Sequence, residues 1–202
     1  MKKIIVFLAA IIIAISIQVQ AQASDLVNAF ASSYAHEKDG KYADAADDIK
    51  KSYIDSYECN VRLGWLLYAD KKYESAVTYY QKAVLTKPSS LEAYSGLGNA
   101  LAAQEKWTEA NKVYVKMIAV DPNNTTANYR LALGYYYAKN YELADKHNSI
   151  VLKLYPFDYY SNLLEGGIKL AQGKLKEAKA FYHVALLVSP TDTTAKQMVE
   201  KL

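Results

Sequence analysis

Residues 73–88 read YESAVTYYQKAVLTKP, a helix-forming segment that ends at a proline. Ala76 and Ala83 lie on one face of the helix that this segment predicts. Pro88 cannot donate a helical hydrogen bond and disfavours helical geometry in the residue before it, so we expect the helix to end there. Prolines recur every 34 residues, at Pro122, Pro156 and Pro190. This spacing predicts a repeated unit of 34 residues.

Other residue types recur with the same period. Alanine is found at Ala76, Ala110, Ala144 and Ala178. A large residue lies three positions before each of them, at Tyr73, Trp107, Tyr141 and Leu175. Leucine occupies Leu63, Leu97 and Leu131, and the fourth unit has Glu165 instead. Several columns with one period indicate true internal repetition.

Each unit is predicted to form two helices joined by a short polar turn. The second helix begins at the large residue and ends before the proline. Short polar residues after the proline are expected to cap the first helix of the next unit, and they include Ser90, Asn124, Asp158 and Asp192. The small residues are expected to mark the places where two helices approach closely, because a larger side chain there would overpack the contact.

The pattern Leu63-Gly64, Tyr73, Ala76, Tyr80, Ala83, Pro88 and its recurrences resemble the tetratricopeptide repeat family. The resemblance covers residues 57–190 and implies an all-α, right-handed superhelical solenoid of antiparallel helix pairs. It implies one domain over residues 24–202. Its parts would be a degenerate repeat at 25–56, repeats at 57–90, 91–124, 125–158 and 159–192, and a capping helix at 193–202.

The first 23 residues have the composition of a secretory signal peptide. Lys2 and Lys3 precede an apolar run from residue 4 to residue 17, and Ala21-Gln22-Ala23 offers a small-x-small cleavage site. The run is shorter than the roughly 20 residues that a permanent membrane helix needs. We therefore expect cleavage after Ala23, export to a bacterial periplasm and no membrane insertion afterwards. An uncleaved membrane anchor is the alternative.

Composition argues against several classes of function. Removing the two leader lysines lowers the net charge from +3 to +1, which gives no electrostatic basis for nucleic-acid binding. The single cysteine, Cys59, cannot form an internal disulfide. The histidines His36, His147 and His183 fall in different repeats without metal-ligand spacing. We predict no enzyme activity, no metal site and no cofactor.

In the family, the first helix of each pair lines a concave groove that receives peptides. Transferring its inward positions, and the residues beside them, predicts an aromatic groove. Aromatic residues are enriched at binding hot spots, although they could also fill the interior of the solenoid. The predicted groove residues are Arg62, Trp65, Tyr68, Asn99, Tyr129, Arg130, Leu133, Tyr136, Tyr137, Tyr160 and Leu163.

Some family members bind a terminal carboxylate with basic and amide residues in the groove. Val61 and Leu133 occupy places where polar members of such a clamp would lie. We therefore expect Arg62 and Arg130 to pair with acidic groups at the edge of the groove.

The fourth full repeat departs from the pattern because its packing columns hold Asn162, Glu165 and Lys169, while Asn148 replaces a tyrosine. One interpretation is a polar pocket between the third and fourth repeats. The other is a rolled helix that buries Leu164 and Ile168 and leaves Glu165 and Lys169 as an exposed pair. We favour the exposed pair, since burying charge is costly.

The leading hypothesis is an exported module that binds a peptide or protein segment in the aromatic groove. A structural scaffold or self-associating component of a cell-envelope assembly is the alternative, which would make the protein a homo-oligomer. A third hypothesis, an enzyme or small-ligand binder, would require a deep pocket around Asn148, Glu165 and Lys169.

Overall fold

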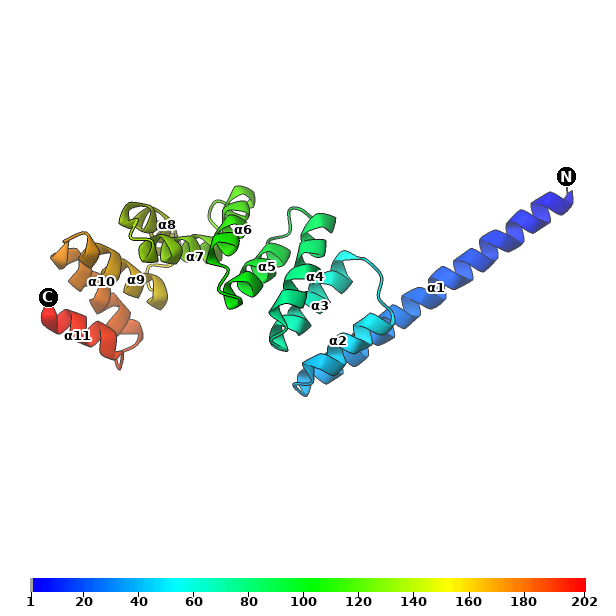
Figure 1. The fold of residues 1–202 in the computed structure, drawn as a ribbon, viewed down its shortest axis with the longest axis horizontal. Helices are drawn as coiled ribbons and strands as arrows, with labels where there is room; N and C mark the ends of the chain where they lie inside the picture. Colours follow the sequence, from blue (N-terminus) through cyan, green and yellow to red (C-terminus); the bar gives the residue numbers. More distant parts are fainter. Residues whose placement is uncertain (1) are drawn as a thin grey trace. The chain divides into compact units, whose positions relative to one another are not determined.

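A computed structural model describes the backbone of residues 2–202 and the side chains of residues 18, 20 and 22–202 (Figure 1). Every regular element in this part of the chain is an α-helix. The chain divides into two compact units, residues 1–104 and residues 105–202. The prediction of a single domain over residues 24–202 stays a prediction.

The first unit holds five helices within the described residues. They are α1 (Lys2–Lys38), α2 (Tyr42–Lys51), α3 (Tyr57–Ala69), α4 (Tyr73–Thr86) and α5 (Leu91–Ala103). Each of these helices packs against the next along the chain, and the contact between α3 and α4 is the most extensive. The unit is therefore a stack of helix hairpins in which local neighbours form the core.

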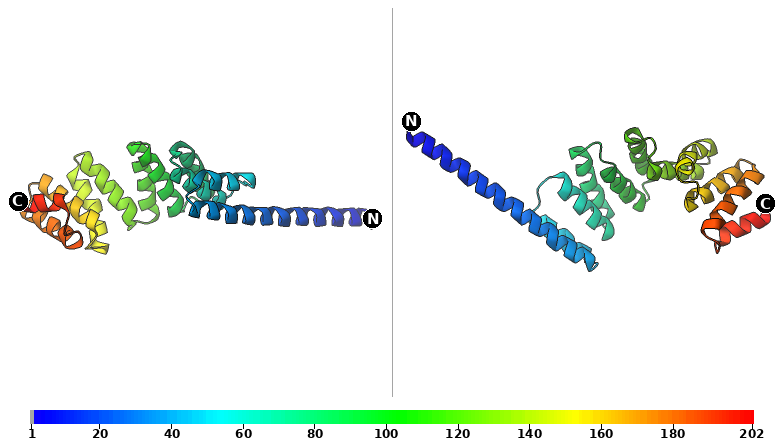
Figure 2. Two further views of the ribbon diagram at one scale, coloured as in Figure 1. Left: turned by 90° about the horizontal axis from the view of Figure 1, so that it is seen from below. Right: turned by 180° about the vertical axis from the view of Figure 1, so that it is seen from behind.

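The second unit repeats this arrangement. Its helices are α6 (Trp107–Val120), α7 (Thr125–Tyr137), α8 (Tyr141–Leu154), α9 (Tyr159–Ala171), α10 (Leu175–Val188) and α11 (Thr193–Lys201). Figure 2 shows α7 with α8, and α9 with α10, as neighbouring antiparallel pairs. The predicted all-α fold of antiparallel helix pairs is confirmed.

Helix starts follow the predicted caps. The side chains of Ser90, Asn124 and Asp158 accept hydrogen bonds from the backbone N–H three residues on, at 3.1, 3.0 and 2.8 Å. Asn162 has a structural role that recurs in the repeat. Its amide donates to the carbonyl oxygens of Pro156 and Asp158, each at 2.8 Å. Asn128 makes the equivalent pair of bonds one repeat earlier. These bonds satisfy the backbone around each repeat boundary.

Small residues admit tyrosine rings between the helices. A Cβ on Gly64 would lie 2.9 Å from the ring of Tyr80, and one on Gly96 would lie 2.2 Å from the same ring. In the second unit, a Cβ on Gly166 would lie 2.7 Å from Tyr182. Both tyrosines are buried, so glycine is needed at these contacts because any larger residue would displace the ring.

The two ends of the chain are the predicted leader and the last helix, α11. Most residues of the predicted leader, residues 1–23, have side chains outside the described part of the structure. Cleavage of the leader stays a prediction. Among the residues that the structure describes, no helix is long and apolar enough to span a membrane. At the other end, α11 packs against α10 through Ala195, Met198 and Val199.

Candidate functional site

In the first unit, Trp65 and Tyr68 form a stacked aromatic pair on α3. Their ring centroids are 6.3 Å apart with an interplanar angle of 28°. Trp65 is 44% exposed, and its indole N–H donates to Oε1 of Glu37 at 2.5 Å. Trp65 lines a cavity of about 360 Å³ together with Tyr34 and Tyr57. Asn99 is half-buried on α5.

Arg62 has the predicted acidic partner, Glu37, and lines the same cavity as Trp65, but it is buried instead of lying at an exposed edge. It is only 6% exposed, and its guanidinium donates to Oγ of Ser33 at 3.0 and 3.1 Å. It also pairs with Glu37, and its Cζ lies 3.9 Å from the centre of the Tyr34 ring. The reason is that this face of α3 turns toward α1, so Arg62 joins the two helices instead of meeting solvent.

In the second unit, α6 and α7 enclose a cavity of about 540 Å³. Its lining includes the predicted residues Arg130, Leu133 and Tyr137 and two residues from α6, Trp107 and Asn111. Tyr137 is 75% exposed and Trp107 is 58% exposed, so both rings are accessible at the margin of the cavity. Exposed rings beside an apolar wall are typical of binding hot spots.

Arg130 has a different environment from the one predicted. It makes no ion pair and no hydrogen bond with any residue that the structure describes, so the expected pairing with an acidic group is wrong. It is half-buried against the cavity. A guanidinium in this position is available to a carboxylate or carbonyl oxygen of a ligand.

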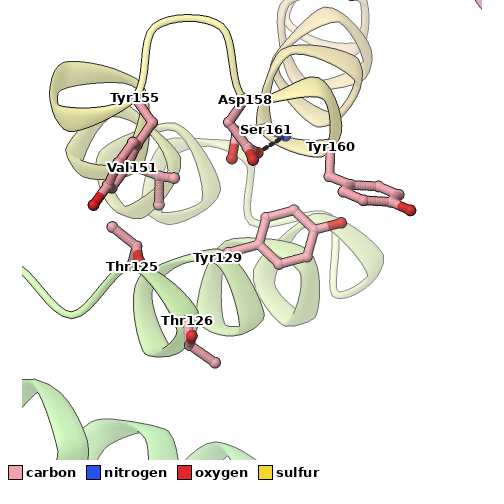
Figure 3. A pocket seen from close by; sticks show the side chains of 8 residues that line it. All are labelled: Thr125, Thr126, Tyr129, Val151, Tyr155, Asp158, Tyr160 and Ser161. Atoms are coloured by element: carbon pink, nitrogen blue, oxygen red, sulfur yellow. Dashed lines mark hydrogen bonds between the residues drawn. The ribbon is translucent and has the colours of Figure 1, made fainter. Parts of the chain in front are cut away.

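Tyr129 and Tyr160 line another cavity, of about 320 Å³, between α7 and the start of α9 (Figure 3). Their ring centroids are 6.5 Å apart. Burial raises the pKa of Tyr129, so its phenol stays protonated and can donate or accept a hydrogen bond. Tyr155 and Asp158, from the end of α8 and the start of α9, complete the walls.

Two predicted groove residues serve packing instead. Tyr136 is half-buried against a core of Ala132, Ala144 and Ile168, and burial raises the pKa of its phenol. Leu163 packs against the core that α10 and α11 form. The helical period places Tyr136 and Leu163 between the groove face and the core, where packing with the next helix pair takes precedence.

The expectation of an exposed Glu165–Lys169 pair is also wrong. Glu165 is 2% exposed and Lys169 is 8% exposed, although Leu164 and Ile168 are buried as well. Nζ of Lys169 lies 3.1 Å from Glu165 and 2.6 Å from Oδ2 of Asp145 on α8. The helix therefore buries more than one stripe of its surface, because α8 and α10 cover it on two sides.

Charge pairing offsets the cost of that burial. Burial raises the pKa of Glu165, although Asn148 and Lys169 donate hydrogen bonds to it. For Asp145, burial acts in the same direction, but the hydrogen bond and charge of Lys169 outweigh it and hold the pKa below its ordinary value. Burial likewise opposes the charged form of Lys169, and its two carboxylate partners raise its pKa in spite of it. This network of charged and amide side chains joins α8 to α9, so we assign it a role in stabilising the fold.

Comparison with known proteins agrees with the repeat pattern. The sequence model of the tetratricopeptide repeat family matches residues 61–125. Residues 61–125 of the chain are tetratricopeptide repeats. The uncharacterized protein ycf37 of Cyanophora paradoxa is 31% identical over 71 residues, which is 35% of this chain. The chain spans 41% of the length of that curated relative.

Solved structures share the tetratricopeptide repeat fold with this chain. A tetratricopeptide repeat protein from Parabacteroides merdae has a TM-score of 0.78 and 15% identity, covering 87% of this chain and 71% of that protein. MamA from Desulfovibrio magneticus has a TM-score of 0.73 and 20% identity, covering 84% and 98%. YrrB, described as having an unusual peptide-binding site, has a TM-score of 0.65 and 21% identity, covering 78% and 79%. At these identities the likeness shows the fold alone.

Some residues that line the two cavities of the second unit were missed by the groove prediction. Trp107 belongs to the column of large residues at helix starts, and Tyr155 and Asp158 flank a repeat boundary. The groove positions of the family belong to first helices, so they do not include residues of second helices and loops. An exposed aromatic residue beside a proline boundary was the available signal.

Proposed function

We propose that this protein is an exported module that binds a peptide or protein segment, and that the α6–α7 cavity is its main contact site. Tetratricopeptide repeats are protein-interaction modules, which supports binding over catalysis. The observation that carries the proposal is the cavity of about 540 Å³ between two exposed aromatic rings, Trp107 and Tyr137.

The walls of this cavity suggest what it binds. Leu133 and the two rings provide apolar surface, and Asn111 provides an amide that can pair with a peptide backbone. Gly134 leaves room for Asn111, because a Cβ there would lie 3.0 Å from the amide nitrogen. The unpaired Arg130 suits an acidic residue next to an apolar or aromatic anchor. YrrB, which shares the fold, has a peptide-binding site, and this likeness supports a peptide as the ligand class.

The first experiment selects peptides from a random displayed library on the immobilised protein. Fluorescence anisotropy then measures the Kd of a selected peptide for the wild type and for two variants. We expect Tyr137→Ala to weaken binding by about thirtyfold, since hot-spot aromatic residues contribute about 2 kcal/mol. Phe157→Ala is the matched control, because Phe157 is exposed in the same unit and does not line the cavity. It should change the Kd less than about twofold.

The same experiment separates the rival hypothesis. Leu154, Tyr155 and Phe157 form an exposed apolar group at the end of α8 and in the following loop, which could support self-association. If no peptide depends on Tyr137, while the wild type sediments as an oligomer that Phe157→Ala disrupts, the scaffold hypothesis replaces peptide binding.

Export is tested by producing the full chain in a Gram-negative host and fractionating the cells. The basic start, the apolar run and the small residues before Ser24 support cleavage after Ala23. Mass spectrometry of the periplasmic fraction should find a protein that begins at Ser24. An intact first residue on a membrane-bound product would instead support the anchor.

A further inference from the structure

The cavity that Tyr129, Tyr155 and Tyr160 border has an unusual set of walls (Figure 3). The three tyrosines line it, and Val151 adds an aliphatic wall. The other lining residues carry hydroxyl groups, except for one carboxylate. They are Thr125, Thr126, Ser161 and Asp158.

Asp158 contributes the only formal charge among these lining residues. Its Oδ1 caps α9 by accepting the backbone N–H of Ser161 at 2.8 Å. Figure 3 shows its carboxylate directed toward the space that the three tyrosines border. The same carboxylate interacts electrostatically with Tyr129. A carboxylate carries oxygen sites for several hydrogen bonds, so capping leaves acceptor capacity free.

The cavity is therefore electronegative in two ways. Aromatic faces carry partial negative charge, which attracts cations within about 6 Å of the ring centre. Asp158 adds a full negative charge. Arg130 also acts on Tyr129, but it lines the neighbouring α6–α7 cavity and not this one. The N-termini of α7 and α9 place partial positive charge beside the cavity, and the full charge of Asp158 together with the ring faces opposes it, so a cation is favoured over an anion.

A second observation points to a ligand with hydrogen-bond donors. Ser161 is fully buried, and its hydroxyl oxygen has no hydrogen-bond partner among the residues that the structure describes. A buried polar atom without a partner is unfavourable, so a donor that reaches it after a movement of the lining side chains would gain stability. The hydroxyls of Thr125 and Tyr129 offer further acceptors around the same cavity.

We propose that this cavity binds the ammonium group of a lysine side chain carried by the segment that occupies the neighbouring α6–α7 cavity. The inference rests on the proposed function, since α7 contributes residues to both cavities. The tyrosine rings attract the charge, and Asp158 and the hydroxyl groups accept its three N–H donors. Val151 and the rings pack against the methylene groups of the lysine.

Lysine suits the site better than the other cations. A quaternary ammonium has no N–H donors and would leave the hydroxyl acceptors without partners. The planar guanidinium of arginine requires paired acceptors in one plane, whereas a single carboxylate that already caps a helix offers fewer of them. A sugar would use the hydroxyls but would gain nothing from the charge of Asp158.

The test is an NMR titration of the full-length protein with N-acetyl-lysine-N-methylamide. The neutral control is N-acetyl-norleucine-N-methylamide, which has a similar chain and lacks the ammonium group. Amide signals of Asp158 and Ser161 should shift with the lysine compound and not with the control. Asp158→Asn keeps the helix cap, since asparagine caps as well as aspartate, and should weaken lysine binding by about tenfold.

Asp192→Asn is the matched variant, because Asp192 caps α11 as Asp158 caps α9 and lies one repeat further on. It should leave lysine binding unchanged. Equal binding of the two amides, or no loss in Asp158→Asn, would overturn the proposal. Tighter binding of choline or of a monosaccharide than of the lysine compound would overturn it too.

The experiments distinguish a failure of the lysine site from a failure of peptide binding at the α6–α7 cavity. A selected peptide that depends on Tyr137 but not on Asp158 would leave peptide binding in place and refute the lysine site. Shifts caused by the lysine compound, with selected peptides that depend on Asp158 but not on Tyr137, would support the lysine site and refute the main contact at α6–α7.

Discussion

Replacing Lys169 by methionine should lower the free energy of unfolding by about 3–5 kcal/mol. Lys169 lies within 3.1 Å of Glu165 and 2.6 Å of Asp145, and the Glu165 side chain is almost fully buried. Methionine preserves much of the volume of lysine and removes the charge. Two carboxylates would then remain at the α8–α9 contact without a cation, which is the costly way to break a buried ion pair. Chemical denaturation followed by circular dichroism measures the loss.

The pH dependence identifies the cause. Without Lys169, the folded-state pKa of Asp145 should rise above its unfolded value of about 3.8, and that of Glu165, already above about 4.5, should rise further. A carboxyl with a raised folded pKa stabilises the fold below its unfolded pKa, and this stability is lost as the pH rises through the folded pKa. The defect should therefore be largest near neutral pH and shrink as the pH falls toward about 4.

Lys176→Met is the control for Lys169→Met, because Lys176 is an exposed lysine on the neighbouring helix α10. It should change stability by less than about 0.5 kcal/mol. If Lys169→Met is equally mild, or if its defect is the same at all pH values, the ion network does not stabilise the α8–α9 contact.

Replacing Arg62 by methionine should destabilise the first unit by about 2–3 kcal/mol. The change removes two hydrogen bonds to Ser33, the ion pair with Glu37 and the stacking on Tyr34. The expected loss is smaller than for Lys169, because the Glu37 side chain is partly exposed and still accepts a bond from Trp65. Hydrogen exchange measured by mass spectrometry should show faster exchange in α1 and α2.

The stability lost in Arg62→Met depends on pH through the pKa of Glu37. Burial raises the pKa of Glu37, but the bonds from Trp65 and Arg62 and the charge of Arg62 outweigh burial and lower it below 4.5. A carboxyl with a lowered folded pKa stabilises the fold above its unfolded pKa, and the stability is lost as the pH falls through the folded pKa. The difference between wild type and Arg62→Met should thus shrink below about pH 4.

Arg130→Met is the control for Arg62→Met. Both residues were predicted at the groove edge, but Arg130 has no ion pair with the described residues and is only half-buried. Its replacement should leave stability almost unchanged. A similar loss of stability in the two variants would show that the Arg62 contacts with α1 contribute little.

The sequence alone was sufficient for the architecture, because a 34-residue period leaves repeated marks in the chain. Proline, the capping residues and the alanine column each act within a few residues of where they stand. Ser90, Asn124 and Asp158 cap helices as predicted for this reason. Family resemblance then related these local signals to a known fold.

The candidate site was only partly predictable. Tyr137, Tyr160, Leu133 and Trp65 line cavities, and their role in binding stays a prediction. Trp107 and Asp158 were missed because they come from a second helix and a loop. A cavity is bounded by several elements at once, whereas a column in a repeat describes one element at a time.

What the sequence by itself determined was the repeat, the helix boundaries and the small residues at helix contacts. What only the tertiary structure decided was which polar side chains are buried. Arg62, Glu165 and Lys169 pair with side chains of a neighbouring helix or of their own helix, and not with solvent. The physical reason is rotation, because successive residues turn by about 100° around a helix axis. A small roll of α3 or α9 therefore moves a charge from water into a contact, and only the neighbouring helices set that roll.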